Sequence, residues 1–449
     1  MKELIGPEIQ QLIHDKNWRV LKKTLSGNPA PDIADLWETL DEQDMFIIFR
    51  LLSKQLAADV FNELDPDRQI SLLGQMRSAH VRDIISELLP DERTDLFEEL
   101  PGKMTQKLLN LLPPEIRKES LELLGYPKDS VGRLMTPHYV AICPQWTIER
   151  ALEHIRLYGC DAETIDMVYV VDEKCHLIDE IPLRRLILAD PQQTIECLMD
   201  RRFVSVSTLD DQEKAVEVIQ RYNLVALPVI DSENVLVGIV TVDDILDVLQ
   251  EEVTDDIQKM AGIVADKDLL IDASVFKVVK ARMPWLLICL AGGLVAGGVI
   301  AVFENALASV LALAFYVPVV MGMGGNAGTQ TSTVIVRGIA TKQIDPKRIW
   351  RTLFKELKIG AAIGLISGIA VGAAAFLWQD LIELSMTVGF AMFFTVMVAA
   401  TAGGLLPFIF KLLRIDPALT TGPFVTTIKD VTGLLIYFAS AMLFMRHLM

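Results

Sequence analysis

The sequence is poor in cysteine and histidine, and neither residue type forms a metal-binding or redox pattern. The five cysteines include no Cys-x-x-Cys pair, and the six histidines show no His-Glu-x-x-His arrangement. Scattered thiols indicate a reduced intracellular protein rather than a disulfide framework or a zinc site. The first residues, MKELIGPEIQ, lack the apolar core of a secretory signal peptide. Because P-loop, nucleophile-elbow and metal-hydrolase motifs are also missing, we do not expect an enzyme.

Positive charge is scarce in the first 270 residues, which carry 28 Lys/Arg against 51 Asp/Glu. The balance reverses from residue 271 onward, with 14 Lys/Arg against 8 Asp/Glu, and the whole chain has a net charge of −17. A soluble part this acidic argues against nucleic acid as a partner and fits a cation-binding surface. The 449 residues suffice for three or more domains.

Residues 1–129 show a repeat of 24 residues, marked by Leu40, Leu64, Leu88 and Leu112. Segments such as LDPDR and LLPDER place Pro near the first turn of a helix and acids after it. A short fixed period of this kind predicts a stacked helical superhelix, which by itself would serve packing and partner docking. Asp91 and Asp95 lie one helical turn apart, and we expect both to be exposed. They are either plain surface or one side of a contact bridged by a metal ion.

Residues 130–242 alternate short β-rich runs with helices, and the pattern occurs twice with an offset of 59 residues. The copies at 130–193 and 194–242 resemble tandem CBS modules, small regulatory domains that often bind adenine nucleotides. The second copy has the family's GxxTxxD motif as Gly238, Thr241 and Asp244. The resemblance implies that Thr241 and Asp244 hold the phosphate and ribose of ATP or another adenine nucleotide.

The first CBS copy departs from this motif, having Asp179, Pro182 and Arg185 in its place. Weak nucleotide binding is therefore expected. Arg184 is a further candidate contact for the nucleotide, and Arg185 could also reach phosphate.

An acidic connecting helix is predicted at 243–262. Seven carboxylates fall between positions 243 and 256, and one helical stripe holds Asp244, Asp247, Glu251 and Asp255. Like charges at this spacing repel one another and weaken a helix. The stripe is either a solvated outer face or a switch that folds firmly once something neutralises it. Its place between the soluble and the membrane part favours the switch.

The rest of the chain is predicted to enter a membrane. Segment 263–282 is amphipathic and is expected to lie along the membrane surface. Domain 283–449 holds four uncharged stretches of 21, 32, 21 and 27 residues, and a fifth interrupted only by Lys429 and Asp430. A spanning helix needs about 20 residues. The expected fold is therefore a multidomain membrane protein: an all-α superhelical N-terminal domain, an α/β tandem CBS pair and an α-helical domain of five spans.

The distribution of Lys and Arg predicts the orientation of these spans. The connection 342–358 carries six basic residues and 411–416 carries two, so both should lie in the cytoplasm. This arrangement places the soluble domains in the cytoplasm and Met449 outside, in a multi-pass protein of the cytoplasmic membrane.

Asp430 is the sharpest functional signal in the membrane part. A charge at the bilayer centre costs about 2.5–3.5 kcal/mol, so such residues face a bundle interior or a water path. A structural hydrogen bond to another helix is the alternative. Lys429 points about 100° away around the helix, so we expect it to be a poor partner and to snorkel.

The second span, 318–338, is rich in glycine and polar residues, with Gly325, Asn326 and Gln330 as candidate pore-lining positions. One interpretation is irregular backbone beside an aqueous cavity, and the other is close helix packing through small residues. Together with Asp430, the amide and carbonyl oxygens suit a hard cation such as magnesium.

Five segments carry a resemblance to the MgtE family of magnesium channels: MTPHYVA at 135–141, DAETI at 161–165, VTVDDILDVLQEE at 240–252, FYVPVVMGMGGNAGTQ at 315–330 and KDVTGLLIY at 429–437. The resemblance implies a homodimer with a pore near its axis, Asp430 as the pore Mg²⁺ ligand, and the acidic helix as a plug that binds cytosolic Mg²⁺. The implied regulatory ligands are Asp91, Asp211, Glu213, Asp244, Asp247, Glu252, Asp255, Asp256 and Asp416. Asn223 and Gly422 depart from the family pattern.

The expected function is a magnesium-selective channel that mediates Mg²⁺ uptake and is closed by cytosolic Mg²⁺. Two alternatives stay open. One is a nucleotide-gated transporter of another ion that carries CBS modules, and the other is a membrane Mg²⁺ sensor without transport. Uptake of Mg²⁺ by the purified protein in liposomes would separate all three.

Overall fold

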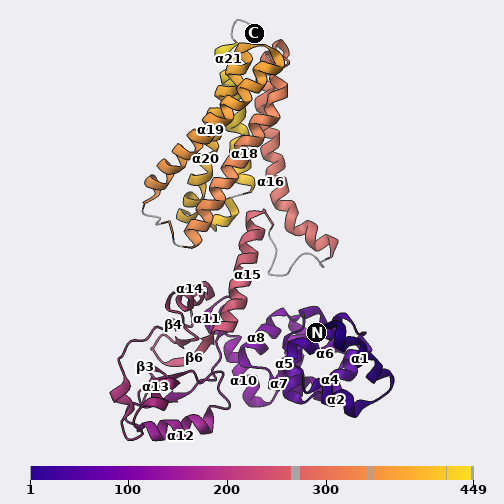
Figure 1. The fold of residues 1–449 in the computed structure, drawn as a ribbon, viewed down its shortest axis with the longest axis vertical. Coiled ribbons are helices and arrows are strands. Elements are labelled where there is room, and N and C mark those ends of the chain that lie inside the picture. The colour runs from indigo at the N-terminus through magenta and orange to yellow at the C-terminus, as the bar shows by residue number, and fades with distance from the viewer. Residues whose placement is uncertain (1, 264–273, 342, 345–347, 421, 446–449) are drawn as a thin grey trace. The chain divides into compact units, whose positions relative to one another are not determined.

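The structure, a computed structural model, describes residues 2–263, 274–341, 343–344, 348–420 and 422–445. The chain divides into two compact units, Met1–Leu249 and Gln250–Met449, and each is described by itself (Figure 1).

The first unit begins with an all-helical domain that confirms the predicted repeat. Its first helices are α1 (Lys2–His14), α2 (Trp18–Leu25), α3 (Ala30–Ala34), the 3₁₀ turn η1 (Asp35–Glu38), α4 (Glu42–Leu51) and α5 (Lys54–Asn62). Five ten-residue helices follow: α6 (Pro66–Gln75), α7 (Ser78–Glu87), α8 (Pro90–Glu99), α9 (Gly102–Leu111) and α10 (Pro114–Leu123). Two such helices make one 24-residue unit, and the repeated leucines Leu64, Leu88 and Leu112 are buried in one common core.

Two α/β modules complete the first unit, as the tandem pattern predicted. The first contains β1 (Ala141–Ile142), α12 (Ile148–Tyr158), β2 (Met167–Val171), β3 (Leu177–Pro182), α13 (Leu183–Leu188) and the 3₁₀ turn η2 (Ile195–Leu198), whose Ile195 is buried in the core of this module. The second contains α11 (Val131–Leu134), which comes earlier in the chain but is buried in this core, β4 (Val206–Ser207), α14 (Gln212–Tyr222), β5 (Ala226–Ile230) and β6 (Leu236–Thr241). Each module has one three-stranded sheet in sequential order, with its first strand pair parallel and its second antiparallel.

The acidic helix α15 (Val242–Met260) starts directly after β6. Ile245 and Val248 are buried in the core of the second CBS module, whereas Leu246, Val253 and Ile257 are exposed. The helix is therefore anchored at its first turns, and its carboxylates remain on the outside or against neighbouring domains.

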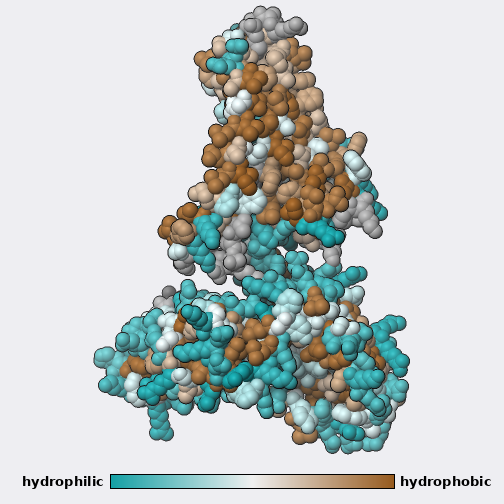
Figure 2. All heavy atoms as spheres, turned by 180° about the vertical axis from the view of Figure 1, so that it is seen from behind, coloured by the Kyte–Doolittle hydropathy of each residue, from teal (hydrophilic) through white to brown (hydrophobic). Residues whose placement is uncertain are grey.

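The second unit is a helical bundle made of α16 (Val275–Val302), α17 (Glu304–Ser309), α18 (Leu313–Ala340), α19 (Ile349–Gln379), α20 (Ile382–Leu412), the 3₁₀ turn η4 (Pro417–Thr420) and α21 (Pro423–Phe444). Among the described residues, α16, α19, α20 and the stretch Pro417–Phe444 are long and apolar enough to cross a membrane. Helix α18 has the same length as α16, but its central glycines and polar residues make it less apolar. It packs against α20 and α21 inside the bundle. The described part of the unit therefore has five long helices, and the face of it drawn in Figure 2 is largely hydrophobic.

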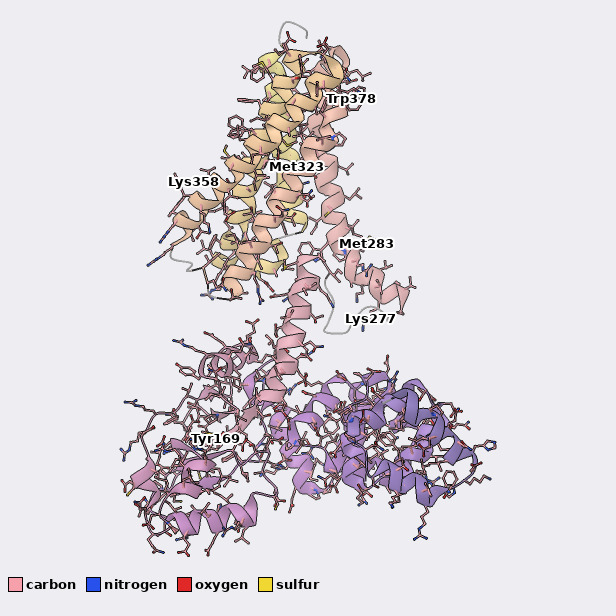
Figure 3. All side chains as sticks on the ribbon, viewed as in Figure 1. Tyr169, Lys277, Met283, Met323, Lys358 and Trp378 are labelled. Carbon is pink, nitrogen blue, oxygen red and sulfur yellow. The ribbon has the colours of Figure 1, made fainter. Side chains whose placement is uncertain are left out.

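The start of α16 bears on the predicted membrane-surface segment 263–282. Residues 264–273 of that segment lie outside the described residues. The remainder, from Val275 to Arg282, continues into α16 without a break, and Lys277 lies near the beginning of this helix (Figure 3). Phe276 is 80% exposed beside Lys277, so the amphipathic character is present at the end of a spanning helix.

The charged residues of helix α19 gather in its first three turns, where Lys358 Nζ lies 5.7 Å from the centre of the Phe354 ring. Lys358 and Trp378 lie toward opposite ends of this helix (Figure 3). The predicted basic connection 342–358 precedes and opens α19, although Lys342 and Lys347 lie outside the described residues. The predicted orientation of the termini stays a prediction.

Candidate functional site

Three carboxylates from distant parts of the sequence meet in the first unit: Asp91 on α8, Glu163 after α12, and Asp244 on the first turn of α15. Helix α8 begins at Pro90, and the side chain of Glu92 accepts a hydrogen bond of 2.9 Å from the Leu89 amide. This cap places Asp91 in the first turn of the helix.

The expectation that Asp91 is exposed is wrong, because only 5% of this residue is accessible. It faces neighbouring parts of the first unit, which the spacing of a helical repeat does not reveal. Asp95, one turn further along α8, is exposed as predicted.

Burial and mutual repulsion raise the pKa values of all three carboxyl groups. Burial is the main cause for Asp91, with Glu163 next, and its pKa is about 7. The pKa of Glu163 is also about 7, because of burial and then the charge of Asp244. Asp244 reaches about 8 through burial and the charge of Asp91, although Thr241 opposes this rise with a 2.7 Å hydrogen bond. Each group thus carries a charge that the others disfavour.

Two oxygen atoms of this acidic cluster are buried without a hydrogen-bond partner, Oδ1 of Asp91 and Oε2 of Glu163. Buried polar atoms are normally satisfied, so these atoms indicate a place for a cation or water. Within the described ranges, however, no three Asp, Glu, His or Cys side chains are close enough to hold one ion directly. Mg²⁺ sheds its waters reluctantly, so contacts through water suit the spacing. Glu163 was not singled out from the sequence, although it lies in the quoted DAETI segment.

The other predicted ligands of the first unit lie apart from this cluster. Asp247 faces the helical domain, where its charge adds to burial in raising the pKa of Glu63. Asp211 caps helix α14, and its Oδ1 accepts a 2.9 Å hydrogen bond from the Glu213 amide. Asn223 ends the same helix in the left-handed conformation, with φ of 53°, which asparagine tolerates well. Asp211 therefore has a structural role at the helix start, and the metal role of Asp211 and Glu213 stays a prediction.

A second acidic cluster lies in the second unit, around the last turns of α15. Lys259 Nζ is 2.6 Å from Asp255 Oδ2 and 2.7 Å from Asp416 Oδ2. Burial lowers the pKa of Lys259, but these two bonds outweigh it and the net pKa is raised. Burial, followed by the charge of Asp416, raises the pKa of Asp256. Glu252 contributes to that repulsion, so four of the predicted ligands share one neighbourhood with Lys259.

The residues predicted to bind a nucleotide lie at two separate sites, one beside a cavity and one at the start of α15. A cavity of about 440 Å³ is lined by Asp166, Met167, Pro182, Leu183, Arg184, Ile187, Leu188 and Val225. Thr241 and Asp244 are not among these residues, and they bind each other instead. Arg185 turns away and donates a 2.9 Å hydrogen bond to the Leu198 carbonyl. Arg184 is thus the one predicted nucleotide residue that borders this cavity.

In the membrane bundle, Asp430 has a partner that the helical spacing did not suggest. Lys429 Nζ lies 3.2 Å from Asp430 Oδ1 and 3.2 Å from the Met321 carbonyl oxygen of α18. Its side chain is only 12% exposed. The expectations that Lys429 is a poor partner and that it snorkels are therefore wrong, because its long side chain bends back to its neighbour between two helices.

The glycine-rich part of α18 is a continuous helix, so of the two interpretations of this span the irregular backbone is wrong and close helix packing is supported. A Cβ on Gly324 would meet Thr395 Cγ2 at 2.8 Å, and one on Gly328 would meet the Ala399 carbonyl at 3.2 Å. The small residues therefore allow α18 to approach α20 closely. Asn326 and Gln330, four residues apart, are exposed on another face of the same helix.

Comparison with known proteins agrees with this architecture. A family model described as a divalent cation transporter matches residues 317–440, the MgtE intracellular N domain matches 28–129, and a CBS domain matches 195–251. The magnesium transporter MgtE of Thermus thermophilus is 38% identical over 448 residues, which are 99% of each chain. The magnesium transporter MgtE of Bacillus subtilis is 38% identical over 326 residues, 73% of this chain and 72% of the relative.

Among solved structures, the cytosolic domain of the Mg²⁺ channel MgtE in complex with ATP is similar to the first part of the chain. It is 36% identical with a TM-score of 0.52, and the match covers 54% of this chain and 99% of that one. The similarity to the Thermus transporter extends over almost the whole chain, through the helical domain, the CBS modules and the membrane helices. The chain therefore belongs to the MgtE family of magnesium transporters.

Proposed function

We propose that this chain is a magnesium-selective channel that mediates Mg²⁺ uptake across the cytoplasmic membrane and is closed by cytosolic Mg²⁺. It acts as a homodimer, with the soluble domains in the cytoplasm and Asp430 as the ligand of the permeating ion. Asn326 and Gln330, which are exposed on α18 in the single chain, line the path with oxygen atoms. Such oxygens suit a hydrated hard cation.

The observation that carries the regulatory part is the cluster of Asp91, Glu163 and Asp244. Burial, and then their mutual repulsion, raises each pKa to about 7 or 8, so the domains that bear them are held together at an electrostatic cost. A divalent cation between them offsets this cost and favours the compact arrangement. It shifts the equilibrium only by its differential affinity for that arrangement.

The second cluster supports the same function. Asp255, Asp256 and Asp416 belong to the end of α15 and to the connection before α21. Mg²⁺ at these carboxylates would fix the acidic helix to the membrane bundle and so hold the path closed.

The test is the open probability of the protein in membrane patches as a function of cytoplasmic Mg²⁺. Asp255→Asn removes a proposed ligand, so closure should require more Mg²⁺ than in the wild type. Asp247→Asn should act in the same direction. Glu251→Gln on the exposed face of α15 removes the same charge outside the proposed ligand set and serves as the matched control. Curves that coincide for all four proteins would leave α15 as a solvated connector.

Binding of ATP or another adenine nucleotide is a second proposal. It is supported by the cavity of about 440 Å³ beside Arg184 and by the relative whose cytosolic domain was solved with ATP. The apolar side chains of the cavity would contact the base, and Arg184 would contact phosphate. The nucleotide would then adjust the Mg²⁺ sensitivity of the CBS modules.

A further inference from the structure

Beside the proposed pore carboxylate, the chain itself holds a cation in place. Lys429 Nζ lies 3.2 Å from Asp430 Oδ1 and donates to the Met321 carbonyl oxygen at 3.2 Å. The Lys429 side chain is 12% exposed, against 28% for Asp430. The ammonium group is thus held between a carboxylate of α21 and a backbone oxygen of α18, and Asp430 keeps an accessible side.

Helix α18 makes room for this ammonium group at Gly325. A Cβ at that position would overlap Lys429 Nζ and would lie 3.1 Å from Cε of the same lysine. At Gly322, almost one turn earlier, an added Cβ would have no atom within 4 Å. The absence of a side chain at Gly325 is therefore what lets Lys429 lie between the helices.

We infer that Lys429 is a positioning residue that determines specificity. Its ammonium group acts as a tethered monovalent cation that excludes free monovalent cations from Asp430. A divalent cation displaces it from the carboxylate. The inference rests on the proposed function, in which Asp430 binds the permeating ion.

The physical reason is an exchange of charges at one carboxylate. A sodium or potassium ion that displaces the ammonium group replaces one single charge with another and gains no attraction. It also competes with a group whose effective concentration is set by its tether and not by the solution. A divalent ion has twice the attraction to the carboxylate at equal distance, so it displaces the ammonium group, which retains its bond to Met321.

The first experiment compares Na⁺ and Mg²⁺ flux through the full-length protein in liposomes. Lys429→Met keeps the length of the side chain and removes its charge. We expect the ratio of Na⁺ to Mg²⁺ flux to rise by roughly tenfold, corresponding to about 1.4 kcal/mol of discrimination. The half-saturating Mg²⁺ concentration should fall at the same time, because the internal competitor is gone. Lys429→Arg keeps the charge and should preserve the wild-type ratio.

The second experiment displaces the same ammonium group by a substitution on α18. Gly325→Ala should displace Lys429 and raise the flux ratio, whereas Gly322→Ala should leave it unchanged. The double variant Gly325→Ala/Lys429→Met should match Lys429→Met alone, because both changes act through one group. This pair keeps the test decisive even if one variant does not fold.

The outcomes separate this inference from the proposed function. Wild-type Mg²⁺ uptake by Asp430→Asn would refute the pore assignment itself. Loss of uptake in Asp430→Asn, together with a wild-type flux ratio in Lys429→Met or Gly325→Ala, would refute only the role of Lys429.

Discussion

Removing the charge of Asp91 should stabilise the soluble unit at alkaline pH in the absence of Mg²⁺. The pKa of this carboxyl group rises from 3.8 to about 7, first because of burial and then because of Glu163. A carboxyl group with a raised pKa destabilises the fold, and the loss grows as pH rises from the ordinary pKa through the raised one. A rise of this size corresponds to roughly 4 kcal/mol once pH exceeds 8.

Asp91→Asn removes the destabilisation that comes from the buried charge. It leaves a buried polar amide in its place, which costs about 1–3 kcal/mol when it lacks a partner. The net gain at pH 8.5 is therefore about 1–3 kcal/mol. For a chain of this size, each kcal/mol raises the melting temperature by about 2–4 °C. At pH 5.5 the wild-type carboxyl group is largely protonated in the folded state, so the advantage of the variant should shrink by roughly 2 kcal/mol.

The assay is thermal and urea unfolding of the fragment 1–262, which holds the helical domain, the two CBS modules and α15. Asp95→Asn, on the exposed part of the same helix, is the control for the loss of one charge. Added Mg²⁺ should stabilise the wild type more than Asp91→Asn, because the variant has lost a ligand. If Asp91→Asn is less stable than the wild type by the same amount at pH 8.5 and at pH 5.5, burial and repulsion do not raise the pKa of this carboxyl group.

Three further outcomes are expected. Asp430→Asn should insert normally but lose Mg²⁺ uptake in liposomes, because the proposed anionic pore ligand is gone. In calorimetry with ATP, Arg184→Ala should weaken binding several-fold while Arg185→Ala, which removes a side chain directed away from the cavity, leaves it unchanged. Gly403→Ala should lower the thermal stability of the purified protein in detergent, since its Cβ would overlap the Gly328 carbonyl oxygen, whereas Gly293→Ala meets no atom within 4 Å.

Local signals predicted most of the fold. The 24-residue repeat predicted that short helices occur in pairs, because Pro and acidic residues mark the start of one helix in each repeat. The offset of 59 residues is reproduced by the strands, with Met167 and Ala226 starting β2 and β5. Uncharged runs located the spans, since a bilayer requires a minimum length of apolar helix.

The continuous helix at α18 shows where propensity was a weak guide. Glycines weaken an isolated helix, but backbone groups in a bilayer must bond within their own segment. Gly324 and Gly328 also pack closely against α20. Both effects favour a regular, closely packed helix, the second of the two interpretations that composition left open.

The clusters depend on contacts between distant parts of the chain, which periodicity cannot reveal. Asp91 was expected to be exposed because its own helix gives no sign of what covers it. Glu163 joins it only through the fold of the first CBS module. Lys429 was predicted to be a poor partner of Asp430 from the angle of about 100° between adjacent residues on a helix. That argument did not include the length of a lysine side chain or the space that Gly325 leaves for it.

The proposed sites differ in how their negative charge is balanced before Mg²⁺ arrives. Lys429 neutralises Asp430, and Lys259 bridges Asp255 and Asp416, so an incoming ion at either place exchanges with an ammonium group. The cluster of the soluble unit has no such lysine among the main influences on its carboxyl groups, and there the raised pKa values make the proton the competitor. At these proposed sites, protons near neutral pH should therefore compete with Mg²⁺ for Asp91 and Asp244, while the lysine-bridged sites should respond to the charge of the cation. Under the proposed function, acidification should relieve the same repulsion that Mg²⁺ relieves in the soluble unit without replacing Mg²⁺ beside Lys259.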